Sequence, residues 1–179
     1  MKTLDFGCGK RKLPGSVGVD ISPDTDADVV HDLNKFPYPF KDGEFTSVKA
    51  DNVVEHLDDL LKVMEELHRI TAPGAELKII VPFFRSVYAF IDPTHRHFFT
   101  CRSFDYFDPA SDFSKFYKYS RARFSVRRVV FDEDYPGTLT DRLVARLANW
   151  KPVFYEARLS ALLPLSTLTF YLETVKETE

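Results

Sequence analysis

Aspartates that follow short apolar segments are the residues of this sequence best placed to do chemistry. Four of them close successive candidate strands: Asp5, Asp20, Asp32 and Asp51. The carboxyl ends of parallel strands meet at one edge of a sheet, where open α/β sheets bind their ligands. Four carboxylates on one edge favour a ligand that is rich in donors or positively charged, rather than a phosphate. Any one of them alone could equally be a turn or helix-cap residue.

A glycine pair, Gly7 and Gly9, directly follows the first of these segments. Glycines at the end of a strand let a ligand approach the backbone, and the carboxylate of Asp20 could accept hydrogen bonds from both hydroxyls of a ribose. The pair is not a complete G-x-G-x-x-G dinucleotide motif, because Lys12 stands where the third glycine would be. A nicotinamide-dependent oxidoreductase is therefore the weaker hypothesis, since the short connection that follows has no helix N-terminus to hold a pyrophosphate.

Three histidines are candidates for assisting a nucleophile: His56, His95 and His97. An imidazole with a pKa near neutrality can take a proton from a hydroxyl group. His56 could instead bond the backbone at a helix start, and the loop around His95 could be purely structural. Asp92, His95 and His97 could also bind a metal, but no second acid or cysteine cluster accompanies them, so we expect no metal site.

The elements that must position these residues alternate between strands and one clear helix. Short apolar segments bounded by turn signals predict five strands, at residues 2–6, 17–21, 29–31, 44–50 and 76–81. Between the last two, apolar residues recur every three or four positions from Val53 to Ile70, which predicts an amphipathic helix. We expect Asn52 to cap its start and Pro73-Gly74 to end it. One β-α-β crossover follows, which indicates an α/β fold.

The pattern is weaker after residue 83. Residues 123–131 read as a strand, and residues 138–149 and 153–162 read as two short helices. In residues 166–175, polar and apolar side chains alternate, which is typical of an antiparallel strand at the edge of a sheet.

Composition sets further limits on the chain. It has 179 residues with 24 Lys/Arg, 27 Asp/Glu and two Cys, which fits one domain and excludes a disulfide-rich secreted scaffold. Neither a membrane-length apolar run nor a signal-peptide pattern is present, so we expect a cytoplasmic protein without membrane contact. Residues 83–131 hold nine Lys/Arg, four Asp/Glu and 15 aromatic residues, which predicts an insertion that contacts the substrate.

The order of motifs in residues 4–82 resembles the small class I S-adenosylmethionine-dependent methyltransferases. The segments that carry the resemblance are Leu4-Asp5-Phe6-Gly7-Cys8-Gly9, Gly18-Val19-Asp20-Ile21-Ser22, His31-Asp32-Leu33, Phe36-Pro37-Tyr38-Pro39-Phe40-Lys41-Asp42-Gly43-Glu44-Phe45, Asn52-Val53-Val54-Glu55-His56-Leu57 and Leu67-His68-Arg69-Ile70-Thr71-Ala72-Pro73-Gly74-Ala75. The resemblance implies a Rossmann-like α/β fold, with a seven-stranded and mostly parallel sheet whose last strand is antiparallel. It also implies S-adenosylmethionine as the cofactor.

The same resemblance implies a role for each matching residue. Asp5, Gly7 and Gly9 would line the methionine part of the cofactor. Asp20, with Ile21 beside it, would bind the ribose hydroxyls. Asp32 and Leu33, after the third strand, would meet the adenine. Asp51 and Asn52, after the fourth strand, would lie beside the methionine amino group.

Two departures from that family lead to further expectations. The connections after the first and second strands are too short for full crossover helices, which leaves one face of the sheet short of cover. We therefore expect either the helices of residues 138–162 or a second copy of the chain, as a homodimer, to cover that face. The chain divides into a cofactor-binding part (1–82), the insertion (83–131) and a C-terminal part (132–179).

For function, we favour methyl transfer to a small acceptor that is anionic or partly apolar. A nucleic acid is the less favoured acceptor because the net charge is only −3. The alternative is a non-catalytic protein that binds the cofactor or a partner on the same sheet.

Overall fold

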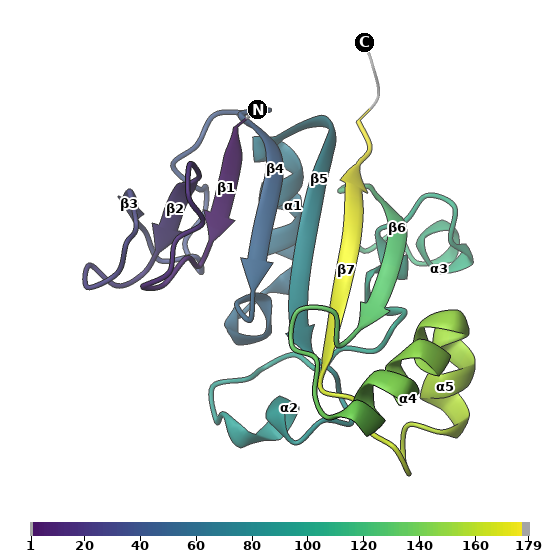
Figure 1. The fold of residues 1–179 in the computed structure, drawn as a ribbon. Coiled ribbons are helices and arrows are strands. Elements are labelled where there is room, and N and C mark those ends of the chain that lie inside the picture. The colour runs from purple at the N-terminus through teal and green to yellow at the C-terminus, as the bar shows by residue number, and fades with distance from the viewer. Residues whose placement is uncertain (1, 177–179) are drawn as a thin grey trace.

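The computed structural model describes residues 2–176, and its centre is a seven-stranded sheet (Figure 1). The strand order is β3-β2-β1-β4-β5-β7-β6. Strands β1 to β5 are parallel to one another, and β7 runs antiparallel to both β5 and β6. The strands span Thr3–Phe6 (β1), Val17–Asp20 (β2), Val29–Val30 (β3), Phe45–Asp51 (β4), Thr71–Pro82 (β5), Phe124–Phe131 (β6) and Thr167–Thr174 (β7). The predicted fold class is confirmed.

The last strand occupies a different place from the one expected. β7 lies between β5 and β6, so it is not an edge strand. Its apolar residues Leu168, Phe170 and Leu172 are buried on one face, and Thr169 is fully buried on the other. The chain just after β6 covers this side of β7, because Asp134 Oδ2 accepts a hydrogen bond from Thr169 Oγ1 (3.3 Å) and Asp132 Oδ1 accepts one from the Thr167 N–H (2.7 Å).

The long helix begins later than its apolar pattern predicts. Asn52 has a positive φ of 54° and does not cap a helix, and only a 3-10 turn, η1 (Val54–His56), follows it. The helix α1 spans Leu60–Ile70, and the Asp59 side chain accepts a hydrogen bond from the Lys62 N–H. β5 begins at Thr71, so Pro73-Gly74 lies within that strand instead of ending the helix. The interruption leaves residues 54–56 on a tight turn directly after β4.

The remaining helices lie on the C-terminal side of β5. They are α2 (Tyr88–Ile91), η2 (Ser103–Tyr106), α3 (Asp112–Phe116), α4 (Leu139–Trp150) and α5 (Pro152–Arg158). The two predicted helices correspond to α4 and α5, and a capping box between Thr138 and Asp141 fixes the start of α4. The short helices α2, η2 and α3 were not expected. None of the helices in residues 2–176 is long and apolar enough to cross a membrane.

The connections β1–β2 and β2–β3 contain no helix, as the sequence predicts. Side-chain carboxylates hold them in place of helix packing. Asp5 Oδ2 accepts a hydrogen bond from the Leu13 N–H (2.6 Å), and Asp28 Oδ2 accepts one from the Gly18 N–H (2.7 Å). Lys12 Nζ adds a 2.8 Å bond to the Asp28 carboxylate.

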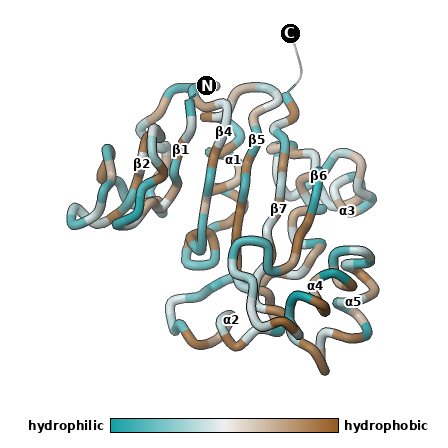
Figure 2. Tube along the Cα trace, in the orientation of Figure 1, coloured by the Kyte–Doolittle hydropathy of each residue, from teal (hydrophilic) through white to brown (hydrophobic). Residues whose placement is uncertain are grey.

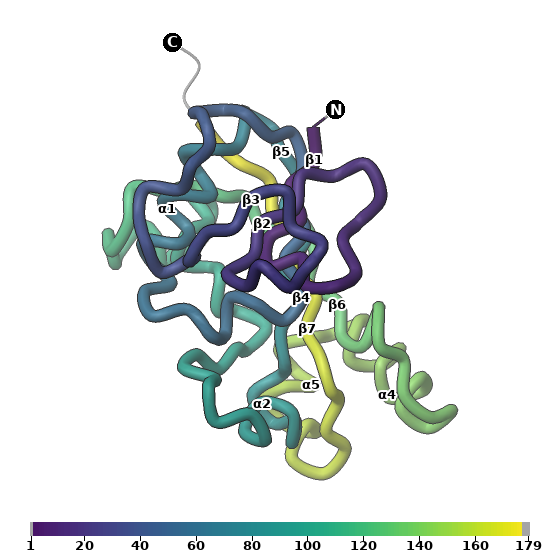
Figure 3. The backbone as a smooth tube through the Cα atoms, turned by 90° about the vertical axis from the view of Figure 1, so that its left-hand side faces the viewer, coloured from purple at the N-terminus to yellow at the C-terminus, as the bar shows by residue number. Residues whose placement is uncertain are grey.

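The two faces of the sheet are covered differently. α1 lies on one face, over a core that includes Val63, Met64 and Leu67 (Figures 1 and 3). On the other face, one register row crosses five strands and is polar throughout: Asp5, Lys49, Lys78, Tyr171 and Arg128. We name this surface the polar face.

The expected cover of the polar face takes a different form. α4 and α5 lie beside the ends of β6 and β7, away from β1 and β2 (Figures 1 and 3). The helices of residues 138–162 therefore do not cover the β1–β2 part of the sheet. The segment 132–138 crosses part of this face, where Lys78 Nζ pairs with Asp134 at 2.7 Å and Tyr135 Oη donates to Asp51 at 3.0 Å. A homodimer remains a prediction.

Many aromatic residues of 83–131 form part of the core instead of contacting solvent or ligand. Six phenylalanines of this segment are at most 2% exposed: Phe83, Phe99, Phe104, Phe107, Phe124 and Phe131. Phe104 packs edge-on against Phe170 of β7, with ring centroids 4.7 Å apart. Hydrophobic residues also gather along α2 and in the segment after α5 (Figure 2). The segment thus builds the C-terminal part of the core, while α2 and the loop after it line a cavity at the carboxyl ends of the central strands.

Candidate functional site

Three cavities meet at Asn52, at the carboxyl ends of the central strands. Their volumes are about 370, 580 and 570 Å³. Asn52 lines all three, Gly7 is shared by the first two, and Tyr135 is shared by the last two. The Asn52 N–H donates to the carbonyl of Ile80 on β5 (2.9 Å), which fixes this residue in its left-handed conformation. Cavities therefore lie at the edge of the sheet where the sequence predicts a ligand.

The first cavity, of about 370 Å³, collects the residues after β2 and β3. It is lined by Asp20, Ile21, Asp32 and Leu33, together with Gly7. Asp20 Oδ2 accepts a hydrogen bond from the Gly9 N–H (2.9 Å) and Oδ1 accepts one from the Ser22 N–H (3.0 Å). These bonds fix the carboxylate, and each oxygen retains a lone pair for a further donor.

The second cavity, of about 580 Å³, lies between the glycine loop and the end of β4. Its lining combines acids with bases: Asp5, Lys10, Arg11, Lys49, Asp51 and Asp134. Asp5 is only 6% exposed and already binds the Leu13 N–H, so its first role is to hold the loop. Asp51 accepts hydrogen bonds from Asn52 Nδ2 (2.8 Å) and Tyr135 Oη (3.0 Å), and it pairs with Lys49 Nζ (3.0 Å).

The two glycines of the loop have different requirements. Gly7 has φ +72°, and a Cβ there would lie inside van der Waals distance of both methyl groups of Val53. Gly9 has φ +55°, and no heavy atom lies within 4 Å of the place where its Cβ would be. Gly7 is therefore needed for packing within the protein, whereas Gly9 leaves open space beside Asp20.

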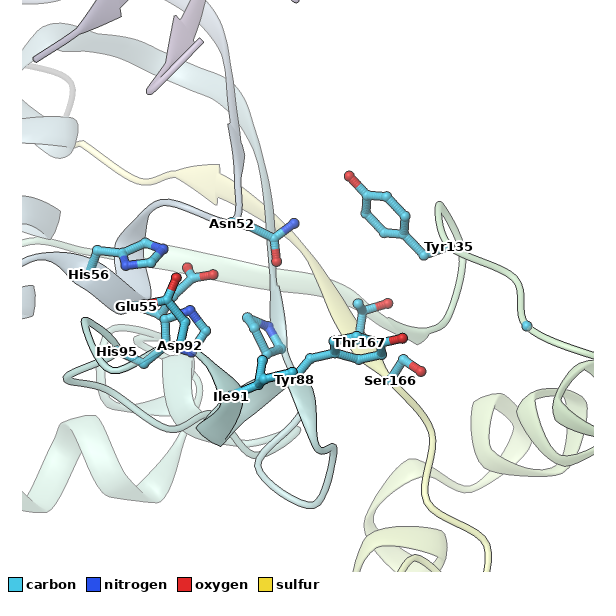
Figure 4. Close-up of a pocket in the computed structure, with 12 residues that line it drawn as sticks. Asn52, Glu55, His56, Tyr88, Ile91, Asp92, His95, Tyr135, Ser166 and Thr167 are labelled. Atoms are coloured by element: carbon cyan, nitrogen blue, oxygen red, sulfur yellow. The ribbon is translucent and has the colours of Figure 1, made fainter. Parts of the chain in front are cut away.

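The third cavity, of about 570 Å³, lies beyond Asn52 and is lined by residues that are far apart in the sequence (Figure 4). Glu55, His56, Asp92 and His95 lie together on one side, and Tyr135 lies apart from them. The full lining is Asn52, Glu55, His56, Pro82, Tyr88, Ile91, Asp92, His95, Tyr135, Gly137, Ser166 and Thr167. We name this space the histidine cavity.

Hydrogen bonds fix the tautomer of both histidines in this cavity. Thr94 Oγ1 donates its only hydrogen to Asp92 Oδ1 (2.6 Å), so it must accept from Nδ1–H of His56 (2.8 Å). Nδ1–H of His95 donates to the Ala89 carbonyl (3.1 Å). Nε2 of each neutral ring therefore carries the lone pair. Burial is the larger cause, and the neighbouring His95 the smaller one, of a lowered pKa of His56, which favours its neutral form.

Glu55 is a residue of this site that the sequence analysis does not predict as a candidate. It is 0% exposed, and neither carboxylate oxygen has a hydrogen-bond partner among residues 2–176. Burial raises its pKa to about 8. Its carbonyl oxygen accepts from the N–H of Arg96 (2.8 Å), which ties the 94–97 loop to the η1 turn.

His97 does not line the histidine cavity. Its Nε2–H donates to the carbonyl of Leu57 (2.8 Å), so the ring anchors its loop to the chain after η1. The possible metal set of Asp92, His95 and His97 is therefore not the set that the fold brings together. His56 and His95 do meet, with ring centroids 4.6 Å apart.

Comparisons with known proteins agree with this geometry. A family model described as "Methyltransferase domain" matches residues 4–79. That match covers the residues of the first two cavities up to Asn52, and it ends before α2 and the segment around Tyr135. None of the curated proteins compared with the chain matches it significantly.

Solved structures share the fold at low sequence identity. A SAM-dependent methyltransferase from Archaeoglobus fulgidus is 18% identical with a TM-score of 0.57, and the match covers 97% of this chain and 86% of that one. A complex of the Haloferax volcanii Trm112 methyltransferase activator with a putative methyltransferase is 16% identical with a TM-score of 0.58, and the match covers 98% of this chain and 83% of that one. The [4+2]-cyclase SpnF is 14% identical with a TM-score of 0.58, and the match covers 98% of this chain and 76% of that one.

The family match places the methyltransferase motifs at the strand ends that line the first two cavities. The structural matches extend the shared fold over nearly the whole chain. Residues 4–79 thus match a methyltransferase-domain family, and the fold of nearly the whole chain is similar to that of solved S-adenosylmethionine-dependent methyltransferases.

Proposed function

We propose that this protein is an enzyme that transfers the methyl group of S-adenosylmethionine to an acceptor bound in the histidine cavity. The observation that carries the proposal is the meeting of the three cavities at Asn52. A cofactor that spans the first two cavities would present its reactive end to the third. Methyl transfer demands alignment of two bound partners more than it demands an acid or a base.

The charges of the first two cavities suit this cofactor. Asp20 would accept hydrogen bonds from the ribose hydroxyls, and Asp32 with Leu33 would meet the adenine. In the second cavity, Asp5 and Asp51 would face the positive amino group, and Lys10 and Arg11 are near enough to meet the carboxylate. These residues all line the cavities in question. The open space at Gly9 supports the fit, because a side chain there would enter the cavity.

When bound, S-adenosylmethionine supplies an electrophilic methyl group on a positively charged sulfur. The protein's contribution is to position the acceptor next to it. His56 and His95 present Nε2 lone pairs on one wall, where they can bind an acceptor group or a ligand that holds it. Tyr135 bonds Asp51 and also lines the histidine cavity, so it links the two binding regions.

The lining favours a small acceptor with an apolar part. Pro82, Tyr88, Ile91 and Tyr135 supply apolar surface, and no Lys or Arg of the described chain lines this cavity. An anionic acceptor, as the sequence suggests, would therefore need a positive group other than those side chains. Several basic residues of 83–131 are paired with acids instead, as in Arg96 with Asp58 at 3.0 Å, which supports a small acceptor over a nucleic acid.

Calorimetry with S-adenosylmethionine and S-adenosylhomocysteine tests the proposal. We expect saturable binding of both, which Asp20→Ala weakens by roughly 10- to 100-fold because the ribose loses a charged acceptor. Asp24→Ala is the matched control, since Asp24 is exposed and lines none of the three cavities. Failure of the wild-type protein to bind either compound would overturn the proposal.

A second candidate function is binding of the cofactor without methyl transfer. The cyclase among the structural neighbours shows that this fold also carries other reactions. Transfer of radioactive methyl from the cofactor to small hydroxyl compounds would separate the two candidates. Cofactor binding without transfer to any acceptor would favour the second.

A further inference from the structure

The histidine cavity contains three potential metal ligands that face one another. One ligand atom each from Glu55, His56 and His95 lies within 4.8 Å of the other two. Glu55 and His56 come from the η1 turn after β4, and His95 comes from the loop after α2. All three line the same cavity.

The Glu55 carboxylate lacks any partner that would explain its burial. It is 0% exposed, and neither of its oxygens is hydrogen bonded within residues 2–176. Buried polar groups are nearly always paired, because an unpaired carboxylate in a dry environment is costly. Its oxygens lie on the wall of a cavity beside two imidazoles. A ligand held at this point would supply the missing partner.

Both imidazoles are prepared for metal binding by their outer hydrogen bonds. A metal-ligating histidine usually donates its other N–H to a carboxylate, a carbonyl or another acceptor, which fixes the ring and raises its basicity. His56 does so through Thr94 to Asp92, and His95 does so to the Ala89 carbonyl. Each Nε2 then keeps its lone pair, with no hydrogen-bond partner among residues 2–176.

Contact between the two histidine rings alone does not account for the cluster. The rings meet edge to face at 4.6 Å, which satisfies neither Nε2. It also leaves both Glu55 oxygens unpaired. A shared cation would satisfy all three groups at once.

We propose that Glu55, His56 and His95 bind one divalent cation of the Mn²⁺, Co²⁺ or Zn²⁺ type in the histidine cavity. Two imidazoles and one carboxylate suit these ions, and such a set leaves coordination positions open. The open positions face the cavity, where an oxygen group of the acceptor can bind. The cation supplies the positive charge that the lining lacks, so the acceptor class that fits bears a hydroxyl or carboxylate.

The acceptor part of this inference depends on the proposed function, whereas the metal site itself does not. Metal binding can therefore be measured on the full chain without cofactor. The protein is stripped with a chelator and titrated with Co²⁺, and visible absorption and calorimetry report the site. We expect about one equivalent of Co²⁺ with imidazole ligation.

Variants decide which residues hold the ion. We expect Glu55→Gln and His95→Ala to weaken Co²⁺ binding by about 100-fold or more, since each removes one of three ligands. His31→Ala is the control, because its Nε2 bonds the Lys35 carbonyl and it lines none of the three cavities. Circular dichroism shows whether each variant is folded, and Glu55→Gln keeps the side-chain shape if His95→Ala does not fold.

The outcomes also separate this inference from the proposed function. Absence of Co²⁺ and Zn²⁺ binding by the wild-type protein, or equal binding by Glu55→Gln, would overturn the metal site. Cofactor binding measured on the same metal-free samples tests the proposed function independently. Metal binding without cofactor binding would leave the site in place and overturn the methyltransferase.

Discussion

The cofactor side and the acceptor side of Asn52 are built in different ways. On the cofactor side, most of the lining residues lie at strand ends or in the short loops after them, and Asp5 and Asp20 are held by backbone N–H groups within eleven residues. On the acceptor side, the wall combines the η1 turn, the α2 loop, Tyr135 and the start of β7. The Glu55 carboxylate there has no hydrogen-bond partner within the described part of the chain. The cofactor side is therefore fixed by local structure, and the acceptor side is fixed by the C-terminal core.

The largest expected effect tests that dependence on the C-terminal core. Phe104→Ala removes a ring that is 1% exposed and packs against Phe170, and it should lower the free energy of unfolding by about 4 kcal/mol. Phe116→Ala is the matched control, because Phe116 is 79% exposed and its removal should change stability little. Urea denaturation measures both. Equal effects would show that the aromatic segment is not a core.

The next effect concerns the glycine loop on the cofactor side. Gly7→Ala combines a positive φ with a clash against Val53, and it should cost about 3 kcal/mol of unfolding free energy. Gly9→Ala has the positive φ but no clash, so about 1 kcal/mol is expected. Adding Val53→Ala to Gly7→Ala should relieve strain. A double variant that unfolds as the sum of the two single ones would contradict the clash.

A smaller effect sharpens the comparison on the acceptor side. Thr94→Val breaks the hydrogen-bond path from His56 to Asp92, and it should weaken Co²⁺ binding by about tenfold through ring misorientation. Binding of S-adenosylhomocysteine should change much less, since Thr94 lines neither cofactor cavity and only its partner His56 reaches the first one. The control is Thr140→Val, whose hydroxyl bonds Thr138 at the start of α4 and lies outside the lining of all three cavities. Loss of cofactor binding in Thr94→Val would mean that the two sides are not separate.

The smallest expected effect lies on the polar face. Lys78→Ala removes a partly exposed ion pair with Asp134, and it should lower the free energy of unfolding by about 0.5 kcal/mol. Thermal unfolding at low and at high salt measures it, and salt should reduce the difference. A loss several times larger would show that the segment 132–138 depends on this pair.

The sequence predicts the cofactor side far better than the acceptor side, and the reason is physical. Asp20 lies in a short apolar run that a turn signal closes, so its position at a strand end can be predicted from the neighbouring residues. Nothing local to Tyr135 or Ser166 marks them as cavity residues, because β7 inserts between β5 and β6 and brings them there. The β7 alternation suggested an edge strand, because the partners of its polar side chains lie far away in the sequence, at residues 132–134.

The helix interruption after Asn52 explains another difference. The apolar pattern continues from Val53 into α1, so periodicity alone predicts one long helix. The left-handed conformation of Asn52 and the extended Leu57 break it. Those breaks place Glu55 beside His56 and His95, and a continuous helix pattern gives no sign of that arrangement.

The polar face reduces the number of strand positions that must be apolar in this fold. A sheet covered by helices on both sides needs two apolar surfaces, and each strand must then be apolar at nearly every position. Here part of one face has no second helix layer, and the polar row of Lys49, Lys78, Tyr171 and Arg128 lies there instead. Lys78 should therefore accept polar substitutions as surface positions do, although it lies in a central strand of the sheet. Lys49 differs because it also lines the second cavity and pairs with Asp51.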